Sequence, residues 1–351
     1  MTGSRTQRAN ATKPARPVTL KDVAAAAGVH VSTVSRTLNP QTRRLVADEV
    51  AARVEQTAED LGYRPDLVAA SLRTGRSRLI GVLVPDIADP VFSPILSGIA
   101  ETLATEGYSA VIADVGSNQA RQMELIDGLM GRRVDGLVLA TVSRSDPVVE
   151  YCVERHVPVV LAYRTEMHPR VSAVVSDDAD GMALAVQHLI DLGHRRIGHV
   201  AGPQHVSTGF LRRRGFEAAA KAHGLRAEEI AVETAASYSR AEGAKTAARL
   251  LEKHPVLTAI VAANDLLALG VYDALKAREL TCPNDVSVVG HNDMPLVDMV
   301  SPPLTTVRIG HREMGEEAAR LLLEEIAGTA GAKRTVTLKP QLIVRSSTRR
   351  P

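Results

Sequence analysis

The chain has 351 residues, 45% of them hydrophobic and 23% charged, and its length suits a small domain joined to a two-lobed one. Its apolar runs fall short of the roughly 18 residues of a membrane-spanning helix, and residues 1–17 lack the apolar region of a secretory leader. Two cysteines are too few for a disulfide framework or a metal cluster, so we expect a cytoplasmic protein without a membrane partner.

The formal net charge of +2 is unevenly distributed along the chain. Residues 1–78 carry 13 Lys and Arg against 7 Asp and Glu, whereas the remaining residues carry 29 against 33. A basic head on a mildly acidic body suggests that the head alone binds a polyanion such as nucleic acid. Basic tails also serve solubility, which leaves a second explanation open. Residues 1–17 are expected to be a disordered basic extension.

The stretch VTLKDVAAAAGVHVSTVSRTLN, residues 18–39, predicts two short helices joined by a tight turn. Thr19 can cap the first helix, Gly28 can adopt the left-handed turn conformation, and Ser32 can cap the second helix. A third helix is expected at about residues 47–61, where apolar residues recur at helical spacing. The pattern over residues 18–64 is typical of a helix-turn-helix whose second helix enters the major groove, and it is also compatible with a generic three-helix bundle.

The same stretch closely resembles the DNA-binding head of the lac repressor family of transcription regulators. The segment LGYRPDLVAASLRTGRSRLIGVLVPD, residues 61–86, continues the resemblance, which extends from about Thr19 to Arg345. Carried over by position, the resemblance implies that Val31 and Ser32 select bases. It also implies a base contact for Arg36, whose guanidinium can form two hydrogen bonds with guanine. The implied phosphate contacts are Thr19, Thr33, Ser35 and Asn39.

Residues 65–77 are expected to form a hinge between the head and the body. Within them, residues 66–74 (DLVAASLRT) are compatible with a helix that is too short to be stable alone. The resemblance implies that this segment folds on DNA as a pair, one copy from each subunit of a homodimer. Leu72 would then wedge into the minor groove, with Ala69 at the contact between the paired helices and Arg73 near the DNA. The alternative is a solvated linker whose Leu72 packs on the body.

After Ser77 the pattern changes to short apolar runs that alternate with amphipathic stretches. The predicted buried strands are LIGVLVPD, YSAVIADV, VDGLVLAT, VPVVLAYR, RIGHVAGP, TAIVAAND and VSVVGHND, followed by a last strand within residues 335–347. Helices are expected between them, for example at residues 94–106, 182–192 and 240–253. The alternation predicts an α/β class with two doubly wound parallel sheets, which bind ligands beyond the carboxyl ends of their strands.

The body, residues 78–347, also resembles the lac repressor family and, beyond it, the periplasmic sugar-binding proteins. The resemblance implies two lobes joined by three crossovers, near Ala162, Asp293 and Ile309, and a dimer contact made mostly by the first lobe. We expect the first lobe at about residues 78–162 and 309–328. The second lobe is expected at about residues 163–292 and 332–347.

A set of residues near the strand ends matches the family's effector contacts. Carried over by position, they are Asp86, Asp89, Phe92, Arg212, Tyr238, Asn264, Asp265, Asn292 and Asp293. Arg212 matches an arginine that binds ligand hydroxyls or a carboxylate, and Tyr238 matches an aromatic residue that stacks on the ligand. Simpler roles are open for two of them, because Asp265 could only cap a helix and Tyr238 could belong to the core. Asn292 stands where the family commonly has aspartate, and His291 replaces a common aromatic, as either a pH-sensitive group or a neutral packed imidazole.

The chain lacks the motifs of the common catalytic and nucleotide-binding sites. It contains no phosphate-binding GxxxxGK[ST], no GxGxxG after a strand and no GxSxG nucleophile turn. His188, His194 and His199 fall on different predicted elements, which does not favour a metal site. We therefore expect no enzyme activity, no cofactor and no metal.

These patterns together predict a homodimeric repressor that a small-molecule effector releases from a palindromic operator. The effector would be a sugar or a related metabolite. One alternative is a corepressor-dependent regulator, in which a purine- or nucleoside-type ligand strengthens DNA binding. The other is a ligand-binding protein without a DNA role.

Overall fold

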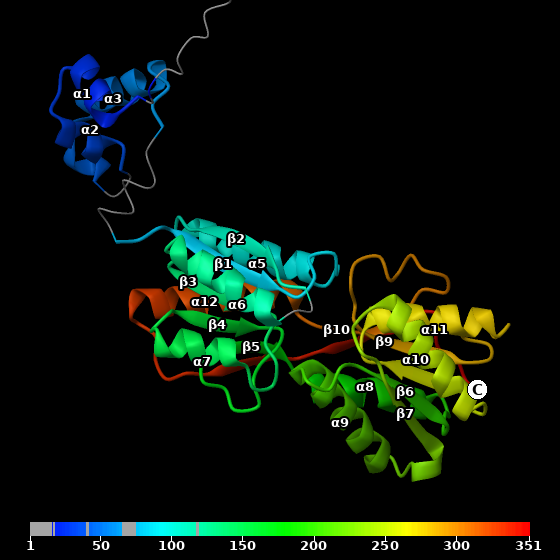
Figure 1. The fold of residues 1–351 in the computed structure, drawn as a ribbon. Helices are drawn as coiled ribbons and strands as arrows, with labels where there is room; N and C mark the ends of the chain where they lie inside the picture. The colour runs from blue at the N-terminus through cyan, green and yellow to red at the C-terminus, as the bar shows by residue number, and fades with distance from the viewer. Residues whose placement is uncertain (1–15, 17, 40–41, 65–74, 117–118) are drawn as a thin grey trace, which may run out of the picture. The chain divides into compact units, whose positions relative to one another are not determined.

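In the computed structural model the chain divides into two compact units, Met1–Ser77 and Arg78–Pro351, each described here by itself (Figure 1). We call the first unit the head and the second the body. The described residues are 16, 18–39, 42–64, 75–116 and 119–351. Within these ranges no helix is long and apolar enough to cross a membrane.

The head is built from three α-helices. They are α1 (Leu20–Ala27), α2 (Val31–Thr37) and α3 (Asp48–Asp60), with a 3-10 turn at Arg43–Leu45 before α3. Val23, Val34 and Val54, one from each helix, are fully buried and form its core. Gly28 follows α1 with a φ of 66°, a left-handed conformation that costs other residues roughly 1–2 kcal/mol. The predicted helix, turn and helix are confirmed, and the third helix lies within one residue of its predicted ends.

The first sheet of the body is parallel, with the strand order β11-β5-β4-β3-β1-β2. Its strands are β1 (Leu79–Val84), β2 (Ser109–Asp114), β3 (Gly136–Leu139), β4 (Val159–Ala162), β5 (Ala173–Ser176) and β11 (Thr335–Leu338). One face packs against α5 (Phe92–Thr105) and α12 (His311–Ala327), and the other against α6 (Gln119–Gly131) and α7 (Pro147–Glu154). This sheet and its helices form the first lobe.

Two glycines allow α5 and α12 to approach each other closely. A Cβ atom on Gly98 would lie 2.4 Å from the backbone oxygen of Arg312, and one on Gly315 would lie 2.1 Å from that of Ile95. Both distances are shorter than atoms tolerate, so any larger residue would push the helices apart. The two glycines therefore let α5 and α12 pack closely, although these helices lie before and after the second lobe in the chain.

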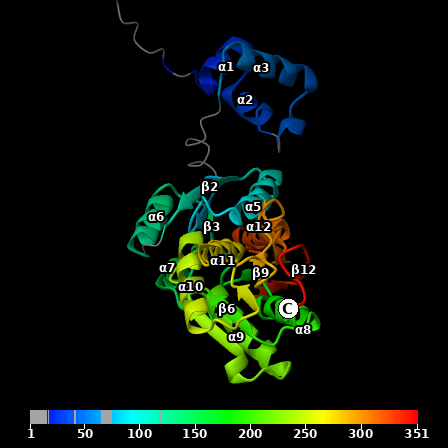
Figure 2. The ribbon, with the colours of Figure 1, turned by 90° about the vertical axis from the view of Figure 1, so that its right-hand side faces the viewer.

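The second sheet has the order β12-β10-β9-β8-β6-β7 and is parallel except for β12, which pairs antiparallel with β10. Its strands are β6 (Ile197–Ala201), β7 (Ile230–Thr234), β8 (Ala259–Ala262), β9 (Ser287–Asn292), β10 (Thr305–Arg308) and β12 (Gln341–Ile343). The helices α8 (Asp178–Asp191) and α9 (Ser207–Ala222) cover one face, and α10 (Arg240–Lys253) and α11 (Asp265–Ala277) cover the other (Figure 2). These elements form the second lobe.

The observed sheets correct the predicted lobe boundaries. Strand β5 pairs with β4 and β11 in the first sheet, so residues 173–176 and 335–338 do not belong to the second lobe as expected. The chain passes between the sheets after β5, after β10 and between β11 and β12. The predicted crossover near Ile309 is confirmed, whereas those near Ala162 and Asp293 are wrong. Short strands such as AVVS carry little periodicity, and only their hydrogen-bond partners decide which sheet they join.

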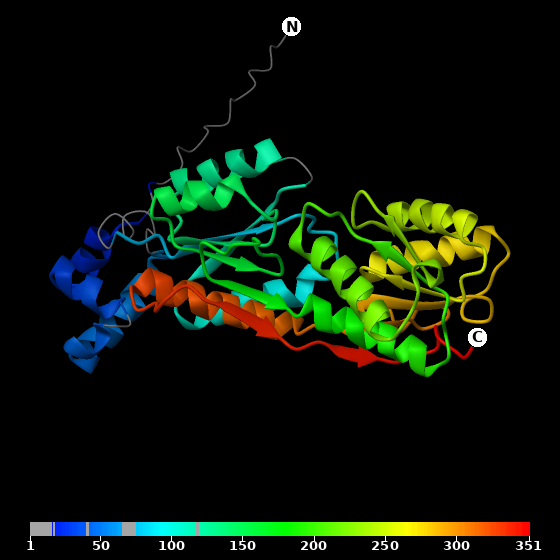
Figure 3. The ribbon, with the colours of Figure 1, turned by 90° about the horizontal axis from the view of Figure 1, so that it is seen from below.

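The last predicted strand is also two strands rather than one. Lys339 and Pro340 separate β11 from β12, and the two strands lie in different sheets. Figure 3 shows these red C-terminal arrows running from one lobe to the other. Proline has no N–H to donate to a strand ladder, which explains why the break falls there.

Candidate functional site

Thr19 and Asp22 form a reciprocal cap at the start of α1. The backbone N–H of Asp22 donates to Thr19 Oγ1 at 3.4 Å, and the backbone N–H of Thr19 donates to Asp22 Oδ2 at 2.8 Å. The bond from the backbone N–H of Thr19 to the carboxylate is the largest cause of a lowered pKa of Asp22. The Thr19 hydroxyl also donates to Asp22 Oδ2 at 2.8 Å. A phosphate contact by Thr19 would therefore compete with an existing intramolecular bond.

The cap of α2 differs from the prediction. His30, not Ser32, precedes the helix, and its Nδ1 accepts the backbone N–H of Ser32 at 3.3 Å. The Ser32 hydroxyl lies 2.8 Å from the same nitrogen. An imidazole nitrogen can accept a hydrogen bond as a carboxylate does, which explains how His30 can cap the helix in place of Ser32.

The outward face of α2 carries most of the predicted DNA contacts. Ser32 and Arg36 are exposed, while Val31 is half-buried and packs partly against the core of the head. The half-buried residues Thr33, Ser35 and Asn39 complete the predicted contacts on the described part of the head. The predicted hinge contacts Ala69, Leu72 and Arg73 lie outside the described residues.

In the body, Arg212 forms a buried ion pair with Asp178. The two side chains are 1% and 5% exposed, and Arg212 Nε donates to Asp178 Oδ1 at 2.7 Å. Arg212 Nη1 also donates to the backbone oxygen of Ala263 at 2.7 Å. Although burial disfavours its charge, Asp178 and the other groups around it raise the pKa of Arg212 above its usual value. Arg212 is therefore a fixed positive charge beyond the carboxyl ends of the second sheet's strands.

Tyr163 connects the first lobe to this charge, and the sequence analysis did not identify it. Asn292 is the last residue of β9, and its Nδ2 donates to Tyr163 Oη at 3.1 Å across the two lobes. The Tyr163 ring lies 5.9 Å from the Arg212 guanidinium carbon and 5.4 Å from the Phe92 ring. Tyr163 and Asn292 have φ angles of 68° and 113°, and such strained backbones persist mainly at functional sites. The predicted residues Phe92, Arg212 and Asn292 thus converge on one tyrosine.

Arg164 is a second residue that the sequence analysis missed. Burial lowers the pKa of Arg164, and the nearby Tyr163, Tyr238 and Asp89 oppose that shift. The Nε of Arg164 is buried and has no hydrogen-bond partner among the described residues. Burial also raises the pKa of Asp89, whose Oδ1 accepts the backbone N–H of Val91 at 3.1 Å. Arg164 therefore has an unused donor and lies near enough to Asp89, Tyr238 and Arg212 for them to influence its pKa.

Tyr238 is held in place by contacts within the second lobe. Its hydroxyl donates to Thr208 Oγ1 at 3.2 Å, and burial raises its pKa to about 12. A Cβ atom on Gly202 would lie within 2.6 Å of its ring. Tyr238 is half-buried and packs against the core of the second lobe. It lies near Arg212, Tyr163 and Arg164, and we call these four residues the Arg212 cluster.

Two predicted residues at the end of β8 have separate structural roles. Asn264 caps α11, because its Oδ1 accepts the backbone N–H of Leu267 at 2.9 Å. Asp265 is not that cap; it accepts the backbone N–H of Met294 at 2.8 Å and the hydroxyl of Thr306 at 2.5 Å. Burial raises the pKa of Asp265 to about 7. Its carboxyl group ties the start of the loop after β9 to β10.

Two further predicted residues make contacts with groups outside the Arg212 cluster. Asp293 accepts from Arg308 Nε at 2.7 Å and pairs with Arg345 Nη2 at 2.7 Å, so both of its oxygens are occupied. Asp86 is exposed, and its Oδ1 accepts the backbone N–H of Ala88 at 2.8 Å. The effector roles predicted for Asp293 and Asp86 stay predictions.

Several buried polar atoms at the strand ends have no hydrogen-bond partner among the described residues. Besides Arg164 Nε, they are Thr141 Oγ1, Thr165 Oγ1 and Ser176 Oγ, which lie at or just beyond the ends of β3, β4 and β5, together with His291 Nε2 and His311 Nε2. Buried polar atoms are almost always paired with protein, water or ligand. Burial lowers the pKa of His291 well below its usual value, which favours the neutral packed imidazole over a pH-sensitive one.

The three histidines of the HLIDLGHRRIGH stretch serve separate contacts. His188 Nε2 lies 2.9 Å from Thr348 Oγ1, and His194 Nε2 lies 2.8 Å from the backbone oxygen of Arg349. His199 lies 2.9 Å from the backbone oxygen of Val261 and stacks on a phenylalanine ring. In the part of the chain that the structure describes, no three metal-ligating side chains come together.

Two family profiles match the chain. The profile described as "Bacterial regulatory proteins, lacI family" matches residues 19–66, and the profile described as "Periplasmic binding protein-like domain" matches residues 186–348. The ribose operon repressor of Escherichia coli (strain K12) is 33% identical over 332 residues, which cover 94% of this chain and 99% of that protein.

Solved structures resemble the chain over nearly its whole length. The lac repressor dimer bound to operator and the anti-inducer ONPF has a TM-score of 0.84 at 28% identity, covering 95% of this chain and 100% of that one. A complex of the transcriptional regulator CelR with cellobiose has a TM-score of 0.72 at 31% identity, covering 94% of this chain and 99% of that one.

Proposed function

Because the chain belongs to the lacI family of bacterial regulatory proteins, we propose that it is a homodimeric transcriptional repressor. Its head binds a palindromic operator, and a sugar or related metabolite bound in the body releases it. The observation that carries the effector role is the buried Arg212 cluster, where Arg164 Nε and neighbouring polar atoms have no partner among the described residues. Because a bacterial repressor binds genomic DNA, we expect the protein in the cytoplasm. The repressor relatives support a function without catalysis and without a cofactor.

The DNA contacts of this proposal lie on α2 and at the hinge. Arg36 is exposed on the face that enters the major groove, where its guanidinium reads guanine. Ser32 lies one turn earlier on the same face, and Val31 contributes an apolar contact. Thr19, Thr33, Ser35 and Asn39 hold phosphates. For Ala69, Leu72 and Arg73 the proposal rests on the family resemblance alone.

The effector contacts of this proposal are the residues that converge on Arg212. Arg164 and Arg212 donate to ligand oxygens, Asp89 accepts from ligand hydroxyls, and Tyr163, Phe92 and Tyr238 supply aromatic surface. Asn292 bonds with Tyr163 across the lobes, so a ligand that displaces or extends this bond changes how the lobes meet. Such a change shifts the population between operator-bound and released states.

The test is a selection of genomic DNA fragments by the purified full-length protein, with and without D-ribose or cellobiose. Enrichment of a palindrome of roughly 14–20 base pairs that is lost with sugar supports the proposal. Enrichment only in the presence of ligand would instead support the corepressor alternative. The Arg36→Ala variant is the matched control, since it should fail to enrich the same sequence. No enrichment under any condition would contradict the DNA-binding role.

A further inference from the structure

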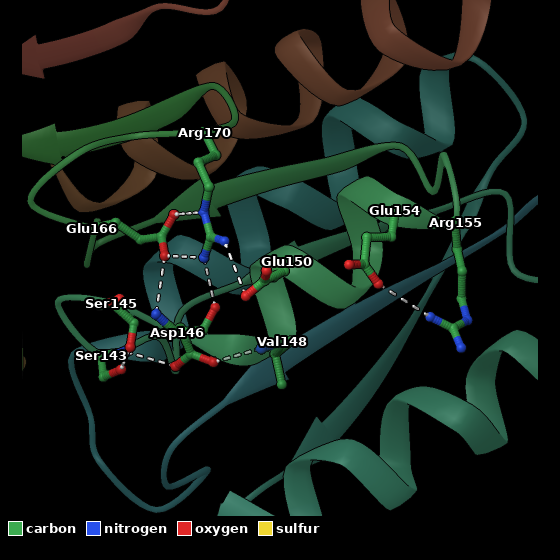
Figure 4. Close-up of polar contacts among 9 residues, drawn as sticks. All are labelled: Ser143, Ser145, Asp146, Val148, Glu150, Glu154, Arg155, Glu166 and Arg170. Atoms are coloured by element: carbon green, nitrogen blue, oxygen red, sulfur yellow. Dashed lines mark hydrogen bonds and ion pairs between the residues drawn. The ribbon is translucent and has the colours of Figure 1, made fainter.

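Two loops of the first lobe are braced by a buried glutamate (Figure 4). Glu166, in the loop after β4, is 2% exposed at its side chain. Its Oε1 accepts the backbone N–H of Asp146 at 3.0 Å, from the loop after β3, and Arg170 Nη2 at 2.6 Å. Arg170 Nη2 also donates to the backbone oxygen of Asp146 at 2.8 Å. The carboxylate of Glu166 and the guanidinium of Arg170 thus bind both the backbone N–H and the backbone oxygen of Asp146.

The loop after β3 is rigid in its own right. Asp146 caps α7 by accepting the backbone N–H of Val148 at 3.0 Å, and its other oxygen accepts that of Ser143 at 2.8 Å. The backbone N–H of Met167 donates to the backbone oxygen of Arg144 at 2.9 Å, which adds a direct bond between the loops. The two loops therefore move as one unit, which we call the braced loops (residues 143–146 and 163–170).

The braced loops contact the second lobe at the start of α9. The backbone N–H of Arg144 donates to the backbone oxygen of His205 at 3.0 Å, and its guanidinium lies 4.1 Å from the centre of the Phe210 ring. The backbone N–H of Thr165 donates to Ser207 Oγ at 3.0 Å. These contacts join two different loops to α9 and to His205 just before it, and α9 also carries Arg212.

We propose that the braced loops are a latch that holds the two lobes together in the absence of effector. The inference rests on the proposed function, because it concerns how the effector site is regulated. Separating the lobes must break these two hydrogen bonds, the Asn292–Tyr163 hydrogen bond and one contact between a guanidinium and an aromatic ring. A hollow of about 670 Å³ beside Arg144 and Arg170 gives the Arg144 side chain room to leave Phe210. The latch raises the fraction of protein molecules in the conformation that can bind effector. A larger fraction in this conformation raises the apparent affinity for effector.

The test measures hydrogen–deuterium exchange in the full-length protein without ligand or DNA. In the Arg144→Ala variant, the Thr165 amide should exchange about three- to tenfold faster, because its bond to Ser207 breaks when the lobes separate. The Asp146 amide, bonded to Glu166 within the first lobe, should stay as slow as in the wild type. The matched control is Arg155→Ala, which removes a guanidinium 3.7 Å from the Tyr151 ring within the first lobe and should change neither amide.

A second variant separates the brace from the latch. Glu166→Gln removes the charge that holds both loops, so it should accelerate both the Asp146 and the Thr165 amides. If Arg144→Ala leaves the Thr165 amide unchanged, or accelerates both amides equally, the latch is disproved. Because no ligand or DNA is present, this outcome is independent of the operator selection, and either proposal can fail while the other stands.

Discussion

Replacing Arg212 by methionine should lower the stability of the second lobe, because Asp178 would be buried without its counter-ion. The two side chains are 1% and 5% exposed, and the atoms that pair lie 2.7 Å apart. Removing one partner of a buried ion pair typically costs about 3–5 kcal/mol, since the remaining charge is neither hydrated nor paired. We expect the free energy of unfolding to fall by about this amount at neutral pH.

The loss should depend on pH in a defined direction. Burial already raises the pKa of Asp178, and Arg212 opposes that rise, so the Arg212→Met variant raises the folded-state pKa further. A carboxyl group whose pKa is higher in the folded than in the unfolded protein takes up a proton on folding. Its stability penalty is absent below the unfolded pKa and grows as the pH rises through the folded pKa. The variant should therefore lose less stability at about pH 5 than at about pH 8.

Guanidinium chloride unfolding followed by circular dichroism measures both effects. The matched control is Arg213→Met, because Arg213 lies on the same helix and pairs with Glu217, but these side chains are 39% and 40% exposed. That pair should contribute less than about 0.5 kcal/mol. Adding Asp178→Asn to Arg212→Met should remove the pH dependence and recover part of the loss. The reasoning is refuted if Arg212→Met loses no more than Arg213→Met, or loses the same at both pH values.

Three other outcomes follow from the structure. Arg36→Ala should weaken binding to the selected operator by about 1–3 kcal/mol more than binding to a scrambled duplex; fluorescence anisotropy measures both, and equal losses would exclude base reading. Gly315→Ala should destabilise the first lobe by about 1–3 kcal/mol in thermal unfolding, whereas Gly131→Ala, with open space around it, should not. Burial raises the pKa of Asp265 to about 7, above its unfolded value, so wild-type stability should fall as the pH rises from 6 to 8. The Asp265→Asn variant should show a flatter melting-temperature profile, and an equally steep one would contradict the assignment.

The local features of this protein could be predicted from its sequence. The cap at Thr19, the turn at Gly28 and the apolar spacing of the head depend on residues within a few positions of one another. The seven apolar runs of the body identified seven strands for the same reason, although β2 was wrongly predicted to be buried, because it lies at the edge of its sheet. The motifs that carry the family resemblance also lie within two short contiguous stretches, residues 18–39 and 61–86, which is why the class of function followed from them.

The lobe boundaries and the centre of the proposed effector site were decided only by the tertiary structure. Strand β5 joins the first sheet because it pairs with β4 and β11, and no pattern within its four residues indicates those partners. Asp178 lies 34 positions from Arg212, and Tyr163 lies 129 positions from Asn292. Hydrogen bonds and ion pairs between such distant residues form only when folding brings the strand ends together. Burial then gives these contacts their strength, because it removes the water that would otherwise compete for the same groups.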